Sequence, residues 1–139
     1  MRIALSLVLA AAPAAAQQLP VLQLNAGMHL VRAEVAADNP SRSRGLMHRK
    51  SLAPNAGMLF VFDAPALHCM WMRNTYIPLS VAFLDAQGSI INIADMQPHN
   101  EESHCAARPA LYALEMTQGW FAQRGIKPGL KLGGLEKLR

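Results

Sequence analysis

Beyond residue 17 the chain consists of short apolar runs separated by turn-forming residues. The short length of these runs constrains the fold more than any other feature of the sequence. Residues 27–35 alternate apolar with polar side chains, which is the period of a strand buried on one face. Residues 79–84 and 89–94 are two more β-rich runs, and Asp85–Gly88 between them has the composition of a hairpin turn. Runs this short do not supply the long amphipathic helices of a bundle, so the sequence predicts a sheet.

Other segments extend this expected sheet. We predict further strands at residues 57–62, 69–72, 110–116 and 130–138. The last strand is weakened by Gly133-Gly134. Residues 110–116 fit a helix or a strand on periodicity alone. A strand is favoured there because Thr117 can cap a new short helix over residues 118–124, which Gly125 would end.

A short helix is predicted to follow the first strand. Asp38 or Asn39 can cap it, Pro40 suits the first helical position, and residues 41–48 follow as a polar turn and a half. Taken together, the segments predict an α+β, mostly β fold: a small antiparallel, barrel-like sheet with one or two short helices. Residues 17–139 have the size of a single domain.

The N-terminus has the layout of a secretory signal peptide. Arg2 supplies a positive charge, residues 3–12 are mostly apolar, and the alanines at 14–16 precede Gln17 in the manner of a cleavage site. We therefore expect residues 1–16 to be removed and the product to be periplasmic or secreted. No apolar run reaches the roughly 18 residues of a membrane-spanning helix, so no membrane span is expected.

The chain has two cysteines, Cys69 and Cys105, which are expected to form a disulfide because export places them in an oxidising compartment. The chain-entropy model gives such a bridge roughly 4 kcal/mol. Each cysteine follows a histidine, so a Cu(I) site with His68, Met72 and His104 is the alternative. The disulfide is favoured because neighbouring residues on a strand point to opposite faces, which places His68 and Cys69 poorly for binding one ion. We predict no metal and no cofactor.

Several short motifs follow one another along nearly the whole of this domain. They are Arg44-Gly45-Leu46-Met47, Gly57-Met58-Leu59-Phe60, Trp71-Met72-Arg73-Asn74-Thr75 with Ile77-Pro78-Leu79, Asp85 with Gly88, Met96 with Pro98, and Leu114-Glu115 with Gly119. In this combination the chain resembles the exported and archaeal proteins grouped as domain of unknown function 192 (DUF192). The resemblance implies a small, barrel-like α+β domain and implies no settled activity. Ser80 and Leu130 depart from the family pattern, because each stands where a carboxylate is common.

Five polar residues are candidates for binding a ligand. They are Arg44, Arg73, Asn74, Thr75 and Glu115. An arginine fork binds a carboxylate or phosphate through two hydrogen bonds, and Asn and Thr add directional donors and acceptors. A structural reading stands beside this one: Arg44 or Arg73 pairs with Glu115, while Asn74 and Thr75 bond to the backbone of their own turn.

The charge distribution and the absence of known catalytic motifs limit the classes of function that the sequence suggests. The formal net charge of +4 is spread over scattered basic pairs, whereas nucleic-acid-binding domains concentrate theirs on one face, so no nucleic acid is expected as a partner. No nucleophile elbow, metal-binding His pair or phosphate loop is present, so no catalytic motif marks an enzyme. The sequence predicts a small exported domain, monomeric, that binds a small ligand or a protein partner through the polar corner at Arg73–Thr75. Two alternatives stay open: a periplasmic copper-handling protein using Met, His and Cys, and a small hydrolase using Glu115 and Asp95.

Overall fold

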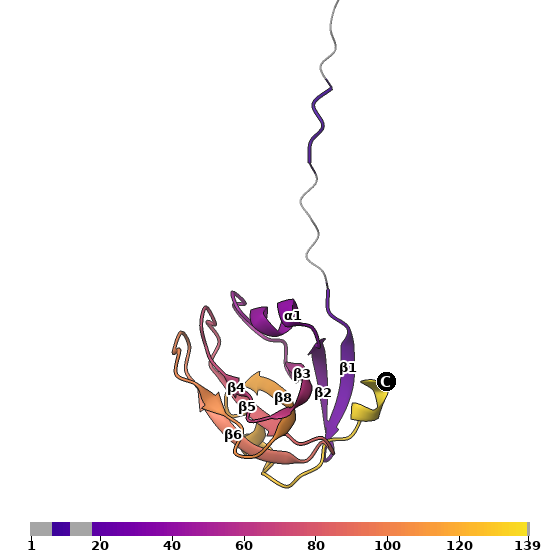
Figure 1. Ribbon diagram of the computed structural model, residues 1–139, viewed down its shortest axis with the longest axis vertical. Coiled ribbons are helices and arrows are strands. Elements are labelled where there is room, and N and C mark those ends of the chain that lie inside the picture. The colour runs from indigo at the N-terminus through magenta and orange to yellow at the C-terminus, as the bar shows by residue number, and fades with distance from the viewer. Residues whose placement is uncertain (1–6, 12–17, 139) are drawn as a thin grey trace, which may run out of the picture.

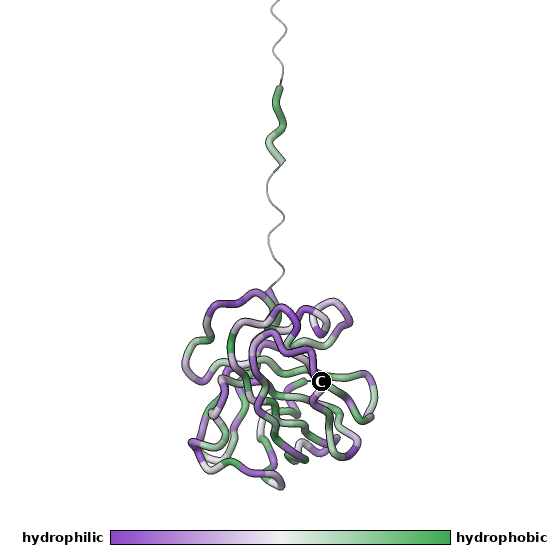
Figure 2. Tube along the Cα trace, turned by 90° about the vertical axis from the view of Figure 1, so that its left-hand side faces the viewer, coloured by the Kyte–Doolittle hydropathy of each residue, from purple (hydrophilic) through white to green (hydrophobic). Residues whose placement is uncertain are grey.

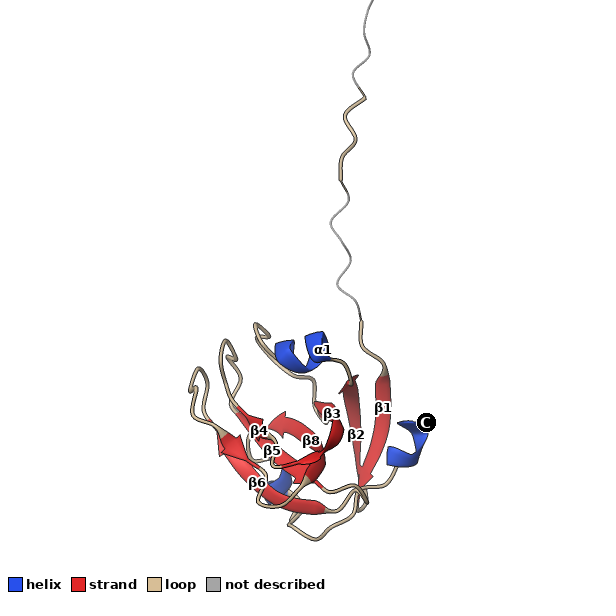
Figure 3. Ribbon diagram, viewed as in Figure 1, coloured by secondary structure: helices blue, strands red, loops and turns tan. Residues whose placement is uncertain are grey.

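The computed structural model describes residues 7–11 and 18–138, which form one main sheet flanked by a small strand pair (Figure 1). The main sheet has the order β1-β2-β3-β8-β5-β6, and the small sheet pairs β4 with β7. The strands are β1 Val21–Ala26, β2 His29–Ala36, β3 Ala56–Ala66, β4 Cys69–Met70, β5 Leu79–Leu84, β6 Ile90–Met96, β7 His104–Cys105 and β8 Ala110–Thr117. The helices are α1 Asn39–Arg44, α2 Trp120–Gln123 and a 3-10 helix, Leu135–Leu138 (Figure 3).

The predicted fold class, α+β and mostly β, is confirmed. One neighbouring pair in the sheet, β2 with β3, is parallel because α1 and the loop after it carry the chain back to the starting end of the sheet. The other neighbours are antiparallel, so the sheet is mixed, and it stays open because β1 and β6 do not pair with each other. None of the helices in the described residues is long and apolar enough to cross a membrane. Of the predicted signal peptide, only residues 7–11 lie inside the described ranges.

Some predicted elements differ from the observed ones. β1 was not predicted; it pairs with residues of β2 in the register Val21↔Glu34 to Ala26↔His29. The predicted strand at 130–138 is wrong, because only isolated bridges occur there before the 3-10 helix begins at Leu135. The predicted cap Thr117 is instead the last residue of β8, and Gly119 in the left-handed region precedes α2.

Both faces of the main sheet are buried, which explains why β5 has no exposed residue. One face packs Leu24, Leu59, Leu114 and their neighbours against Trp120 and Phe121 of α2. The other face packs β-sheet side chains against the segments around α1 and β4. Its residues include Leu46, Met58, Phe60, Met72, Leu79, Val81, Phe83 and Met96. Hydrophobic stretches accordingly lie mainly inside the body of the domain, whereas many of the outer loops are hydrophilic (Figure 2).

The C-terminal segment links the two edges of the sheet at one end of the molecule. The N–H of Leu132 donates to the carbonyl of Gly88, next to β6, over 2.9 Å. On the other side, Asn25 of β1 and Gly133 exchange two backbone hydrogen bonds of 3.0 and 2.9 Å. The chain then ends beside β1 (Figure 1). At the opposite end of the sheet, where α1 lies, loops make the connections instead: the N–H of His48 donates to the carbonyl of Asn74, and the N–H of His99 donates to the carbonyl of Thr75.

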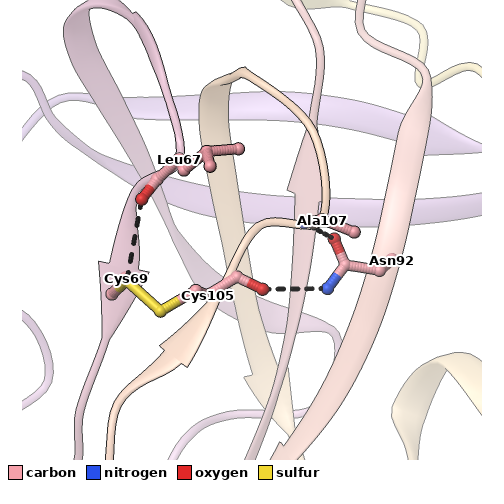
Figure 4. The surroundings of a disulfide bond; sticks show 5 residues. All are labelled: Leu67, Cys69, Asn92, Cys105 and Ala107. Atoms are coloured by element: carbon pink, nitrogen blue, oxygen red, sulfur yellow. Dashed lines mark hydrogen bonds between the residues drawn. A yellow bond between two sulfur atoms is a disulfide. The ribbon is translucent and has the colours of Figure 1, made fainter.

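The predicted disulfide is confirmed. Cys69 and Cys105 are direct cross-strand partners in the β4–β7 pair, and their sulfur atoms are bonded at 2.05 Å (Figure 4). The Asn92 side chain on β6 holds the bridged strand from the other side: its amide nitrogen donates to the carbonyl of Cys105 (3.1 Å), and its oxygen accepts from the N–H of Ala107 (3.0 Å). The small sheet is thereby fixed to the edge of the main sheet.

Candidate functional site

A cleft of about 250 Å³ lies between α1 and the sheet, at the end of the molecule that the C-terminal segment leaves open. We call it the α1 cleft. It is lined by Asn39, Arg42, Ser43, Arg44, Gly45, Leu46, Met47, Phe60, Phe62, Cys69, Met70, Trp71, Thr75 and Glu115. Its walls therefore combine the aromatic rings of Phe60, Phe62 and Trp71 with polar and charged side chains from α1, Thr75 and Glu115, so the cleft is more polar than the mainly apolar lining of a typical small-molecule site.

Glu115 reaches this cleft from the middle of the sheet. It is the direct partner of Met58 on β3 and of Val81 on β5. Directly opposed residues in antiparallel strands share a face, so the Glu115 side chain lies on the apolar face that includes Phe60 and Met72. Only 4% of the residue is exposed. A lone carboxyl on an apolar face is costly, and its presence calls for a physical account.

The Glu115 carboxyl has no hydrogen bond or ion pair with any residue of the described ranges; the ion pairs found there join Arg42 to Asp63, Arg49 to Glu34 and Arg73 to Glu101. No buried side-chain polar atom in those ranges lacks a partner, so the unbonded oxygens of Glu115 must open onto the cleft. Desolvation by burial raises the pKa of Glu115 from 4.5 to about 8. The group is therefore mainly a neutral carboxylic acid at pH 7, able to donate one hydrogen bond.

Local sequence sets the shape of the cleft at α1. The Asp38 side chain accepts a hydrogen bond from the N–H of Ser41 (2.8 Å), and Ser41 in turn accepts from the Asp38 N–H, so the helix begins at Asn39. The hydrogen bonds from Ser41 hold the pKa of Asp38 below its usual range. The helix ends at Arg44, earlier than the predicted His48, because Gly45 adopts a φ of +47°.

Gly45 is required at this turn for a second reason. A Cβ atom there would lie 3.3 Å from the Phe60 ring, closer than most such contacts. The turn after it is tied down by Arg49, whose guanidinium binds both carboxylate oxygens of Glu34 on β2, and by the N–H of His48, which donates to the carbonyl of Asn74 (2.9 Å). The segment carrying Arg44 is thus held over the sheet by contacts on both sides.

The two arginines of α1 differ in how they are engaged. The Arg42 guanidinium donates to the carbonyls of Ala37 (2.7 Å) and Val61 (2.8 Å) and pairs with Asp63 (3.3 Å), so it ties α1 to β3. Arg44 is exposed, lines the cleft and forms no hydrogen bond or ion pair within the described residues. Arg44 is therefore the cationic group there that is free to meet a ligand.

The predicted polar corner is only partly at the cleft. Thr75 lines it and is buried, with its hydroxyl donating to the carbonyl of Arg73 (3.0 Å). Arg73 does not line it; its side chain lies 3.9 Å from a Glu101 oxygen and 5.6 Å from the Trp71 ring centroid. Asn74 occupies a left-handed turn position, φ +51°, outside the cleft lining. Of the five predicted ligand-binding residues, Arg44, Thr75 and Glu115 come together.

The residues of the two alternative hypotheses, the copper site and the hydrolase pair, do not come together at this cleft. Both cysteines are in the disulfide, so no thiolate joins His68, Met72 and His104, and the described residues contain no group of three or more His, Cys, Asp or Glu suited to a metal. The His68 ring instead stacks on Phe62 at 3.8 Å, with its Nε2 2.8 Å from the Ala64 carbonyl.

Asp95, the second residue of the hydrolase hypothesis, lies on the other face of the sheet from Glu115. Its direct partner is Ser80, the neighbour of the Val81 that faces Glu115, and successive residues on a strand point to opposite faces. The Ser80 hydroxyl donates to the Asp95 carboxylate (2.6 Å) and accepts from the N–H of Gly119 (3.0 Å). Glu115 and Asp95 therefore do not face a common substrate.

Comparison with known proteins places the chain. The model of the family DUF192, described as "Uncharacterized ACR", matches residues 21–134. The chain belongs to the DUF192 family. The resemblance drawn from the sequence motifs is confirmed, and a comparison with curated proteins finds no match.

Two solved structures are similar to this DUF192 domain. One is a Sinorhizobium meliloti 1021 protein described as a proposed transcription regulator; it is 34% identical, with 86% of this chain and 97% of that chain covered and a TM-score of 0.81. The other is a protein of unknown function from Novosphingobium aromaticivorans DSM 12444; it is 35% identical, with 88% and 90% covered and a TM-score of 0.77.

Trp71 is one of the residues of this DUF192 site that the sequence did not mark as a candidate. Its side chain lines the cleft and is 45% exposed, while the next residue, Met72, is fully buried. A large aromatic residue left half-exposed at a cleft is informative, since aromatic rings bury much apolar area when they can. The predicted strand at 69–72 ends at Met70, so Trp71 and Met72 lie in the loop that follows β4, and the alternation expected of a strand does not place them.

Proposed function

We propose that this DUF192 domain is an exported binding domain that holds a small organic ligand in the α1 cleft. The observation that supports this most strongly is Glu115, a carboxyl that is 4% exposed, lacks a partner among the described residues and opens onto the cleft. A carboxyl at such a position is normally hydrogen-bonded by the protein itself, because its desolvation is costly. A ligand in the cleft that hydrogen-bonds to the carboxyl would supply the partner that the described residues do not.

Binding rather than catalysis fits the groups at hand. Glu115 has no second titratable acid or base beside it in the cleft, since Asp95 is on the other face and Cys69 is bridged. A hydroxyl nucleophile is usually activated by an adjacent base, and the cleft lining places none beside Thr75. Thr75 and Arg44 offer hydrogen bonds and charge without a proton acceptor.

The proposed transcriptional role of the S. meliloti relative does not transfer readily to a DNA-binding role here. The α-helices in the described residues have six and four residues, and α2 has Trp120 and Phe121 buried in the core. A recognition helix must lie in the major groove and present several side chains to the bases; α1 is fewer than two turns long, and α2 has two of its four residues buried. We propose a small ligand, and no nucleic acid, as the partner of this chain.

The two tryptophans of the chain provide an internal test of ligand binding. Trp71 lines the cleft, whereas the Trp120 indole N–H donates to Asn55 (3.1 Å) in the opposite core cluster. We expect a compound that binds the cleft to shift the NMR signal of the Trp71 indole and to leave that of Trp120 in place. W71F and W120F variants assign the two signals. A screen of small acids, sugars and amides in which no compound shifts Trp71 selectively would refute the proposal.

Export is the second part of the proposal. It is supported by the signal-like residues 1–16 and by the disulfide, which persists in oxidising compartments. Mass spectrometry of the protein recovered from the periplasm or medium of an expressing bacterium is expected to show a chain that starts at Gln17 and carries the bridge. Recovery of only the full-length chain from the cytoplasm would contradict export.

A further inference from the structure

We propose that the ligand of the α1 cleft is a small monocarboxylate with a ring or apolar body, its carboxylate held by Arg44 and a second oxygen accepting a hydrogen bond from Glu115. This inference rests on the proposed function and names the chemical class of its ligand. Three properties of the cleft lead to it: the net charge of its lining residues, the protonated state of Glu115, and the volume and aromatic walls of the cleft.

The charge balance of the cleft favours one negative charge on the ligand. The charged or titratable side chains that line it are Arg42 and Arg44 on α1 and Glu115 on β8, whereas β3 and β4 contribute no titratable group to the lining, because Cys69 is bridged. Asp63 pairs with Arg42, which leaves Arg44. With Glu115 neutral, the net charge facing a ligand is that of one guanidinium. A guanidinium fork binds a carboxylate through two parallel hydrogen bonds.

Glu115 gives the site a neutral donor at its floor. A protonated carboxyl donates one O–H and would bond a hydroxyl, carbonyl or ether oxygen of the ligand. An ionised Glu115 would place a second negative charge in an apolar surrounding and repel an anionic ligand. Protonated Glu115 therefore favours ligands that place a hydrogen-bond acceptor atom next to it.

The walls and volume limit the body of the ligand. Trp71 is 45% exposed and Phe62 lies partly open in the lining, so a ring or a short aliphatic chain can pack between aromatic surfaces. The cleft volume of about 250 Å³ is below the range of about 300–1,000 Å³ typical of sites for drug-sized ligands. A single six-membered ring with one carboxylate matches that size.

Matched pairs of probes test the inference. 4-Hydroxybenzoate with 4-hydroxybenzamide, and glucuronate with glucose, differ chiefly in the negative charge, and each acid carries a hydroxyl oxygen that can accept from Glu115. We expect the acid of at least one pair to shift the Trp71 indole signal and to bind at least tenfold more tightly than its neutral counterpart. R44A is expected to weaken binding of the acid about tenfold, through loss of a charge-assisted pair. R44K restores part of it, and R108A, an exposed residue outside the cleft, leaves it unchanged.

The pH profile tests the role of Glu115. If only the protonated form binds, affinity for the acid falls about tenfold between pH 7 and 9 in the natural protein. E115Q, which keeps every other titrating group and a hydrogen-bond donor, is expected to bind with the same affinity at both pH values. Urea titration of E115Q establishes that it is folded.

Any one of three results would overturn the ligand class. They are a neutral probe that binds as tightly as its acid, an R44A variant that binds the acid as tightly as the natural protein, and an E115Q variant whose affinity still falls between pH 7 and 9. The proposed function fails separately. If glucuronate or 4-hydroxybenzoate shifts Trp71 with the same affinity in R44A as in the natural protein, the cleft is a ligand site and the carboxylate assignment is wrong. If no compound shifts Trp71, both fall.

Discussion

At the scale of single residues, Glu115 links the stability of the folded domain to pH. In the unfolded chain its carboxyl ionises near pH 4.5, but burial in the folded chain raises its pKa to about 8. Below pH 4.5 both states are protonated, so the full stabilising contribution is present. Between 4.5 and about 8 the folded state binds one more proton than the unfolded state, so stability falls as pH rises.

We therefore predict that the free energy of unfolding decreases with rising pH between about 5 and 8, by on the order of 1 kcal/mol per pH unit. E115Q has no ionisable group at this position and is expected to lose that slope, which makes it the more stable protein at pH 8. Urea unfolding at several pH values measures the difference. E102Q, with its side chain in an exposed loop, should retain the natural slope. Parallel profiles for the natural protein and E115Q would contradict the prediction.

Residue types indicated part of the candidate site, and the fold decided the rest. Arg44 and Glu115 could be selected from sequence because their side chains can form ion pairs and hydrogen bonds with a ligand. Arg73 could not be separated from them, because its distance from the cleft depends on how the turn at Asn74 directs the chain. That Glu115 has no ion-pair partner among the described residues is a three-dimensional fact, since the predicted pairing with Arg44 or Arg73 was chemically just as reasonable.

At the scale of elements, the pairing of β3 with β8 depends on Gly57. This glycine is the direct partner of Met116, and a Cβ atom there would clash with the Glu115 carbonyl oxygen and the Met116 sulfur. Both strands are central, so neither backbone can move aside without disturbing a further neighbour. The same contact fixes the strand that carries Glu115.

G57A is accordingly predicted to lower the free energy of unfolding by about 1–3 kcal/mol, the range of overpacked cores. Chemical denaturation measures the loss. G133A is the control: a Cβ atom at that position would lie 3.5 Å from the Asn25 Cβ, which is ordinary contact, and its φ is not in the left-handed region. A stability of G57A equal to that of G133A would show that β3 and β8 can separate to admit the methyl group.

Elements with a strong local signal were predicted, and those defined by their surroundings were not. The hairpin of β5 and β6 was predicted because Asp85 accepts hydrogen bonds from the N–H groups of Gln87 and Ser89, a property of the turn itself. The segment after Leu130 was misassigned as a strand. Its few bridges lead to opposite edges of the sheet, so no single partner strand extends it.

At the scale of the whole molecule, the two ends of the sheet have different roles. One end is linked from edge to edge by the C-terminal segment. The other carries α1, the cleft and the β4–β7 pair, which the disulfide and Asn92 hold in place. Cys69 itself lines the cleft, so the covalent bridge fixes one wall of the proposed ligand site.

The bridge is predicted to stabilise the domain and to set the order of the cleft wall. Cys69 and Cys105 are 36 residues apart, for which the chain-entropy model gives roughly 4 kcal/mol. A C69A/C105A double variant should lose a large part of that in urea unfolding, and reduction of the natural protein should have the same effect.

N92A tests the other attachment: it leaves the bridge intact, removes both hydrogen bonds to residues 105 and 107, and is expected to cost about 1–3 kcal/mol. If the double variant is as stable as the natural protein, the loop between the cysteines is already ordered in the unfolded chain or held by other contacts. Because the β4 wall carries Cys69 and continues into Trp71, the Trp71 indole signal should broaden in the double variant while that of Trp120 stays sharp.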